Sequence, residues 1–143
     1  MIAYVILDAA VRPDTPEALL RLAPPASYRS LFLGTPDATA STSGPWLLAP
    51  ADAPQLAQWL AEVERQHPNG ITLLTSMRPF EAVFAHLQRL LTLRLPGGGA
   101  GLLRYYDPRV MEQLHRVLTA EQRHALFAPF TGWRTCRGQY LPE

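Results

Sequence analysis

The sequence has 143 residues, of which 48% are hydrophobic and 17% are charged, and its formal net charge is +1. This length suits one domain and the composition argues against disorder, so residues 1–143 are expected to form a single folded unit. The near-neutral charge argues against nucleic acid or an anionic membrane as the main partner. Every basic residue is an arginine, which excludes a lysine nucleophile or a phosphate-loop lysine.

The N-terminal segment predicts a buried strand, because Ile2 to Leu7 is β-branched and apolar on both faces. It lacks a basic n-region and its apolar run is only about ten residues, so we interpret it as a strand and not as a signal peptide or a membrane span. The single cysteine, Cys136, excludes an intrachain disulfide and fits a reducing compartment. We therefore expect a cytoplasmic protein.

Start signals and apolar periodicity predict the remaining elements in chain order. Asp14 with Pro16 is typical of a helix start, and Asp52 with Gln55 is typical of another. Thr119 and Gln122 form a capping box between two closely spaced helices. The expected helices are 15–22, 53–67, 79–91, 108–118 and 120–127, and the expected strands are 2–7, 28–33, 46–48, 71–75, 102–106 and an edge strand within 133–140.

Thr35 to Gly44 is rich in small polar residues and predicts a flexible loop. Strands that alternate with helices indicate an α/β domain with a mixed, largely parallel β-sheet flanked by helices.

Residues 95–101, LPGGGAG, do not predict a nucleotide site. Phosphate loops run from strand to glycine loop to helix, and here a helix precedes the glycines and a strand follows them. A helix stop and turn is the better interpretation.

The four histidines, at positions 67, 86, 115 and 124, show no i, i+4 metal-binding pair, and no serine lies in a G-x-S-x-G elbow. We expect no metal, no cofactor and no catalytic residue.

Residues 102–111, LLRYYDPRVM, concentrate charged and aromatic side chains. Asp107 and Pro108 predict a capped helix start, with Tyr106 and Met111 as a hydrophobic staple. This leaves Arg104 and Arg109 unexplained. Two arginines at this place suggest pairing with a carboxylate, either inside the molecule, with Asp107 or Glu112 as candidates, or on a partner.

Several segments together resemble the adaptor proteins of bacterial type VI secretion (Tap/TEC-type), which are catalogued as a domain of unknown function. The segments are YVILDAA, SLFLGTPDA, GPWLL, RPFEAVFAHLQRLLTLRLPGG and LLRYYDPRVMEQLHRVLTAEQRHALFAPFTGW, and they span about residues 4–133. The most specific part is the RYYDPRV stretch. Members often have a stretch rich in glycine and tryptophan before the strand at Ile71, where this chain has the short HPNG.

The resemblance implies a cytoplasmic, non-enzymatic chaperone that binds a toxic effector, through the effector's N-terminal region, and passes it to the VgrG spike. We take Arg104, Tyr105, Arg109 and Trp133 as candidate partner-binding residues. Two alternatives remain open. One is a small α/β hydrolase-like enzyme with a site of arginine, tyrosine and aspartate, and the other is a structural fragment whose exposed edge a further domain covers.

Overall fold

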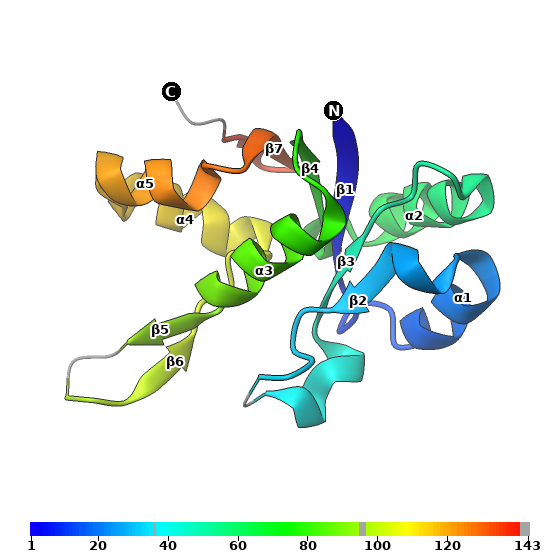
Figure 1. The fold of residues 1–143 in the computed structure, drawn as a ribbon, viewed down its shortest axis with the longest axis horizontal. Helices are drawn as coiled ribbons and strands as arrows, with labels where there is room; N and C mark the ends of the chain where they lie inside the picture. The colour runs from blue at the N-terminus through cyan, green and yellow to red at the C-terminus, as the bar shows by residue number, and fades with distance from the viewer. Residues whose placement is uncertain (36, 95–96, 141–143) are drawn as a thin grey trace.

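The computed structural model describes residues 1–35, 37–94 and 97–140. Helices and strands are interspersed along these ranges (Figure 1). The strands are β1 (Ile2–Asp8), β2 (Tyr28–Ser30), β3 (Pro45–Leu48), β4 (Ile71–Ser76), β5 (Thr92–Arg94), β6 (Ala100–Leu102), β7 (Phe130–Thr135) and β8 (Gly138–Gln139). The helices are α1 (Thr15–Leu22), α2 (Pro54–Gln66), α3 (Phe80–Leu90), α4 (Pro108–Val117) and α5 (Ala120–Phe127), with short 3₁₀ turns at Pro25–Ser27, Ala38–Ser43 and Pro68–Gly70.

The main sheet has six strands in the order β2-β3-β1-β4-β7-β8, and every neighbouring pair is antiparallel. The expectation of a largely parallel sheet is therefore wrong. The reason lies in β1, which pairs antiparallel with β3 on one side and with β4 on the other. The β3–α2–β4 segment does join two strands of the same direction, but β1 lies between them. Periodicity along the chain cannot reveal such an insertion.

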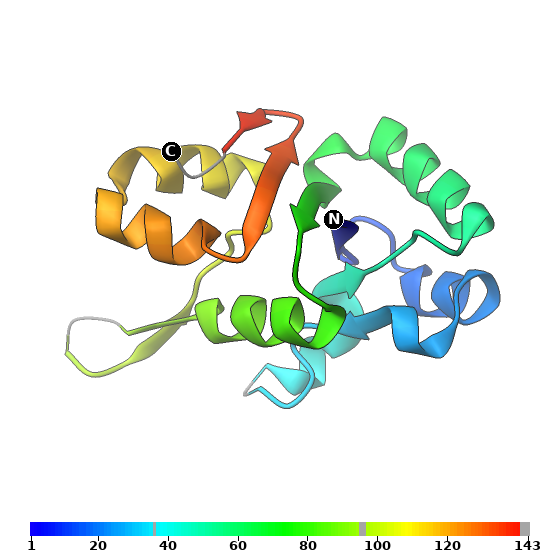
Figure 2. The same ribbon diagram turned by 45° about the horizontal axis from the view of Figure 1, so that its top comes forward.

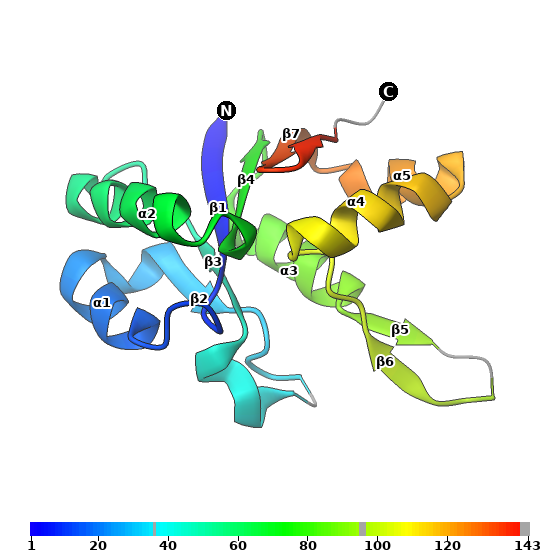
Figure 3. The same cartoon turned by 180° about the vertical axis from the view of Figure 1, so that it is seen from behind.

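Helices cover both faces of this sheet, so the fold remains a three-layer α/β arrangement. Seen from behind, α1 and α2 lie on one side of the strands and α4 and α5 on the other (Figure 3). The first face buries Val5 and Leu7 of β1 against Leu19 of α1 and Leu56 of α2. Burial of such side chains contributes about 1.5–3 kcal/mol each, which fixes the two helices to the sheet.

The opposite face holds the larger apolar cluster, in which α3, α4 and α5 pack on the sheet. Tyr4 and Ile6 of β1 point to this face because side chains alternate along a strand. Val83 and Leu87 of α3 pack against them, and both are fully buried. The expected apolar face of this helix is confirmed.

The helices were predicted closely, and the strand ends less so. The second strand covers only 28–30 of the predicted 28–33, and within the predicted loop 35–44 the residues Ala38–Ser43 form 3₁₀ turns. Asp14 holds the predicted N-cap position of α1, but its side chain makes no capping hydrogen bond and accepts instead from Arg12 Nε at 2.8 Å. Asp52 does not cap α2, whose N-cap is Ala53. The capping box of Thr119 and Gln122 is confirmed.

The segment after α3 differs most from expectation. Among the described residues, strands β5 and β6 pair only with each other, and they form a hairpin that projects from the rest of the molecule (Figure 1). Residues 95–96 of the glycine stretch lie outside the described residues. Gly97 and Gly98 have φ angles of 93° and 94°, which favour glycine, so they form a turn. The predicted strand 102–106 ends at Leu102, and the chain then runs into the core.

The predicted C-terminal edge strand is two strands. β7 lies inside the sheet between β4 and β8, and β8 forms the edge. No helix within the described residues is long and apolar enough to span a membrane.

Candidate functional site

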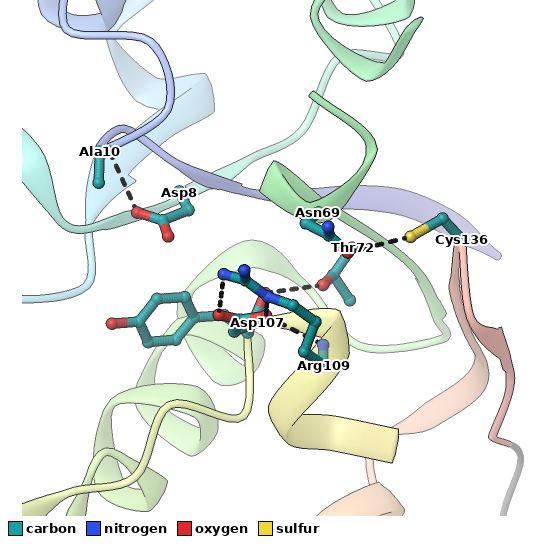
Figure 4. A network of polar contacts seen from close by, with 8 residues as sticks. Asp8, Ala10, Asn69, Thr72, Asp107, Arg109 and Cys136 are labelled. Atoms are coloured by element: carbon teal, nitrogen blue, oxygen red, sulfur yellow. Dashed lines mark hydrogen bonds and ion pairs between the residues drawn. The ribbon is translucent and has the colours of Figure 1, made fainter. Parts of the chain in front are cut away.

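A polar cluster forms where α4 begins, beside the C-terminal end of β1 (Figure 4). Asp107 is the N-cap of α4, and its Oδ1 accepts a hydrogen bond from the backbone N–H of Arg109 at 2.9 Å. Pro108 takes the first helical position, where its missing N–H costs nothing. The predicted cap is confirmed.

The side chain of Arg109 turns back to the same carboxylate. Its Nε donates to Oδ1 of Asp107 at 3.0 Å and its Nη2 donates to Oδ2 at 2.9 Å. Burial alone would raise the pKa of Asp107, but the hydrogen bonds from the guanidinium and the N–H of Arg109 outweigh it and hold that pKa below its ordinary value. The internal partner expected for Arg109 is therefore Asp107. The Arg109 side chain nevertheless stays accessible, because 60% of it is exposed.

Asp8 is a second acid at this place, and it was not among the predicted site residues. It is the last residue of β1, is 7% exposed, and accepts a hydrogen bond from the backbone N–H of Ala10 at 3.1 Å. Burial raises the pKa of Asp8, while the nearby positive charges of Arg104 and Arg109 act in the opposite direction. The sequence did contain a signal for this residue, because Asp8 is an acid at the end of an otherwise apolar strand.

The two tyrosines hold this segment from inside the protein. The hydroxyl of Tyr105 donates to the carbonyl of Leu87 at 2.7 Å, and the carbonyl of Tyr106 accepts from Oγ1 of Thr72 at 3.2 Å. Burial raises the pKa of Tyr106 to about 12, and that of Tyr105 well above its ordinary range. Both hydroxyls therefore stay protonated at neutral pH. The Tyr105 hydroxyl ties the segment to α3, and the Tyr106 carbonyl ties it to β4.

Arg104 is an accessible member of the predicted site. Its side chain is exposed, and its Cζ lies 6.0 Å from the centre of the Tyr106 ring. Within the described part of the chain, no carboxylate lies within ion-pair distance of its guanidinium. The predicted strand position is wrong, since Arg104 follows β6 in irregular backbone.

Trp133 lies in the core and not on the surface. It is fully buried in β7, with its ring centre 6.0 Å from that of Tyr105, 5.4 Å from that of Phe127 and 5.3 Å from that of Phe130. Its indole N–H has no hydrogen-bond partner among the described residues. Tyr105 is also fully buried. In this conformation the structure leaves Arg104 and Arg109, of the four candidates, open to a partner.

The charged side chains of the cluster are suited to ion pairing. Two arginines lie at its surface and two carboxylates lie beneath them, while Thr72 anchors the backbone. Two of the histidines contact residues outside this cluster. His86 Nε2 donates to the carbonyl of Leu126 at 2.8 Å, and His115 packs on Tyr140. Across the described ranges, no group of three His, Cys, Asp or Glu side chains is placed to hold a metal ion.

Comparison with known proteins gives one match. A family model described as Domain of unknown function (DUF4123) matches residues 3–125. No curated protein and no solved structure matches the chain.

Proposed function

The chain belongs to the DUF4123 family, whose function is unknown. We therefore propose a role for it that is based on its own surface and on its resemblance to secretion adaptors. It acts as a non-enzymatic, cytoplasmic adaptor that binds a type VI effector and helps to load it onto the VgrG spike.

One observation carries the proposal: an exposed arginine that forms no ion pair with any described residue lies on a rigid frame. Arg104 is exposed, and the residues that follow it are held by the buried Tyr105 and Tyr106 and by the capped start of α4. Arginine binds carboxylates through two parallel hydrogen bonds and is frequent among residues that dominate binding energy. A pre-organised arginine loses less conformational entropy when a partner binds.

Arg109 complements Arg104 in this role. Its guanidinium already shares the Asp107 carboxylate, but most of its side chain is exposed and its remaining N–H groups can donate to a second acceptor. Two adjacent guanidinium groups would suit an acidic segment of the effector.

The test is co-purification of this protein with the products of its neighbouring genes, scored by mass spectrometry. We expect an effector and the VgrG spike to co-purify with it, and the wild-type complex with the effector to have a Kd of about 1 μM or lower. If neither co-purifies when each is co-expressed with this protein, the adaptor role is wrong. A substrate turned over by the purified protein alone would favour the hydrolase-like alternative.

A further inference from the structure

Part of one sheet face lies beyond the helices that cover it. Val5 of β1 stands beside Leu73 of β4, which stands beside Arg134 of β7, and the next row places Ala3 beside Thr75. These residues share the face that α1 and α2 cover, because they alternate with the residues of the larger core. Leu73 and Thr75 are half-buried and Ala3 is exposed. Figure 2 shows α2 on one side of β4 and the β7–β8 hairpin on the other.

This uncovered area is a groove of about 430 Å³, within the range of about 300–1,000 Å³ typical of ligand sites. Its floor is the sheet, and one wall is the side of α2 that carries Ala57, Leu60 and Ala61. Two alanines four residues apart lie one above the other on a helix, and their small side chains let another backbone approach closely. The groove is therefore mostly apolar and has room for a further layer element.

Two opposite charges flank the apolar floor. Arg134 lines the groove from β7, is exposed, and forms no ion pair or side-chain hydrogen bond within the described residues. Gln139 of β8 pairs with it in register and lines the same groove, so the two side chains can donate together to one carboxylate. Glu64 lines the groove from α2. An occupant complementary to these walls carries an acid on the β7 side and a base on the α2 side.

Exposed methionines lie at the end of the same strands. Met1 is 78% exposed and Met77 is 71% exposed, and pairing of Ile2 with Ser76 brings their strand ends together. The hydroxyl of Thr131 donates to Sδ of Met1 at 3.1 Å, which ties Met1 to β7. Methionine is flexible and polarizable, and it is over-represented on surfaces that adapt to protein partners.

We propose that this groove binds one amphipathic α-helix of the effector, whose apolar stripe lies on Val5, Leu73 and the alanines of α2. Its acidic flank meets Arg134 and Gln139, and its basic flank meets Glu64. A helix fits because the groove lies on a sheet face beside the covering helix α2, whereas strand addition needs a free sheet edge. The proposal rests on the adaptor function above and adds where, and through which kind of segment, the effector binds.

A photo-cross-linking residue tests the location. p-Benzoylphenylalanine replaces Ala61 in the groove or, as the matched control, Gln58, which is exposed on α2 but does not line the groove. The probe is the effector that co-purifies with the wild-type protein. We expect the probe at position 61 to cross-link to an effector segment with an i, i+3, i+4, i+7 apolar pattern and an acidic flank. The probe at position 58 is expected not to cross-link.

Charge reversal tests the chemistry. Arg134→Glu is expected to weaken effector binding tenfold or more, and replacing the effector's flanking acid with arginine is expected to restore it. Arg65→Glu is the matched control, because Arg65 is exposed on α2 outside the groove and makes the same change of net charge. Arg134→Gln provides a milder variant, and thermal melts confirm that each variant folds.

The outcomes distinguish a failure of the groove proposal from a failure of the adaptor function. If the effector binds and neither Ala61 cross-links nor Arg134→Glu weakens binding, the groove proposal is wrong and the adaptor role stands. A cross-link from Ala61 to a second copy of this chain would assign the groove to self-association instead. If no effector co-purifies with the wild-type protein, the adaptor function fails and the groove proposal fails with it.

Discussion

The guanidinium of Arg109 and its own backbone N–H converge on one carboxylate, that of Asp107. The two residues therefore form a closed unit at the start of α4. The unit combines a helix cap with an ion pair, and the two contributions can be separated by substitution.

Asp107→Ala is expected to lower the free energy of unfolding by about 1 kcal/mol, because it removes the acceptor of the Arg109 N–H. Asp107→Asn is expected to lower it less. Asparagine also caps helices, and the ion pair it loses contributes little, since the arginine is largely exposed. Urea midpoints of the three proteins measure the difference. Equal losses in the two variants would show that charge matters and that the cap account is incomplete.

Arg104→Ala is expected to leave the melting temperature unchanged and to weaken effector binding at least tenfold, which corresponds to about 1.4 kcal/mol. The residue is exposed and makes no ion pair among the described residues, so the fold does not depend on its charge. Calorimetric titration with the co-purified effector measures the binding.

Arg116→Ala is the matched control, since Arg116 is exposed on α4 away from the cluster. We expect it to bind like the wild type. If Arg104→Ala lowers the melting temperature while the folded protein binds normally, the arginine supports the fold and the contact lies elsewhere.

Asp8→Asn is expected to raise the free energy of unfolding at pH 7. The pKa of Asp8 is higher in the folded protein than in the unfolded chain, so its favourable contribution is present below the unfolded pKa of about 3.9 and is lost as pH rises through the folded pKa. Asparagine keeps the acceptor for the Ala10 N–H and carries no charge to bury. The gain is expected to shrink as pH falls from 7 toward 4.

Urea unfolding of both proteins across this pH range measures the effect. A gain that stays constant with pH would show that it does not come from ionisation. A loss of stability at pH 7 would show that the negative charge of Asp8 supports the neighbouring arginines more than its burial costs.

His86 is expected to make the protein less stable at pH 5 than at pH 7. Burial lowers its pKa in the folded state, so its contribution is present above the unfolded pKa of about 6.5 and is lost as pH falls through the folded pKa. His86→Gln can still donate to the carbonyl of Leu126 but does not titrate. The variant should therefore show a shallower fall in melting temperature between pH 7 and pH 5, and an unchanged slope would assign that fall to other groups.

The features that were predictable from sequence depend on neighbours a few residues away. Asp107 bonds to Arg109, and Thr119 bonds to Gln122, so both helix starts could be predicted from a short window. The sheet order could not, because it is decided by distant partners: Val5 pairs with Leu48 and with Leu73.

The candidate site likewise has features that were predictable from near neighbours in the sequence and features that were not. The cap at Asp107 was predicted, whereas the burial of Tyr105 and Trp133 was not. An aromatic residue beside charged neighbours has the same local pattern on a surface and in a core. The residues that pack around it decide which environment it receives, as Phe127 and Phe130 do for Trp133.

The position of β1 sets the order in which the protein can be completed during synthesis. β1 emerges first, yet its neighbours come from 45–48 and 71–76, and β4 gains its second neighbour only with 130–135. The family match ends at residue 125, before that strand. A chain cut there would lack Trp133 and would leave β4 with a row of unpaired N–H and C=O groups, which favours aggregation between chains. Expression of this domain therefore needs residues through the β7–β8 hairpin, although the family match does not include them.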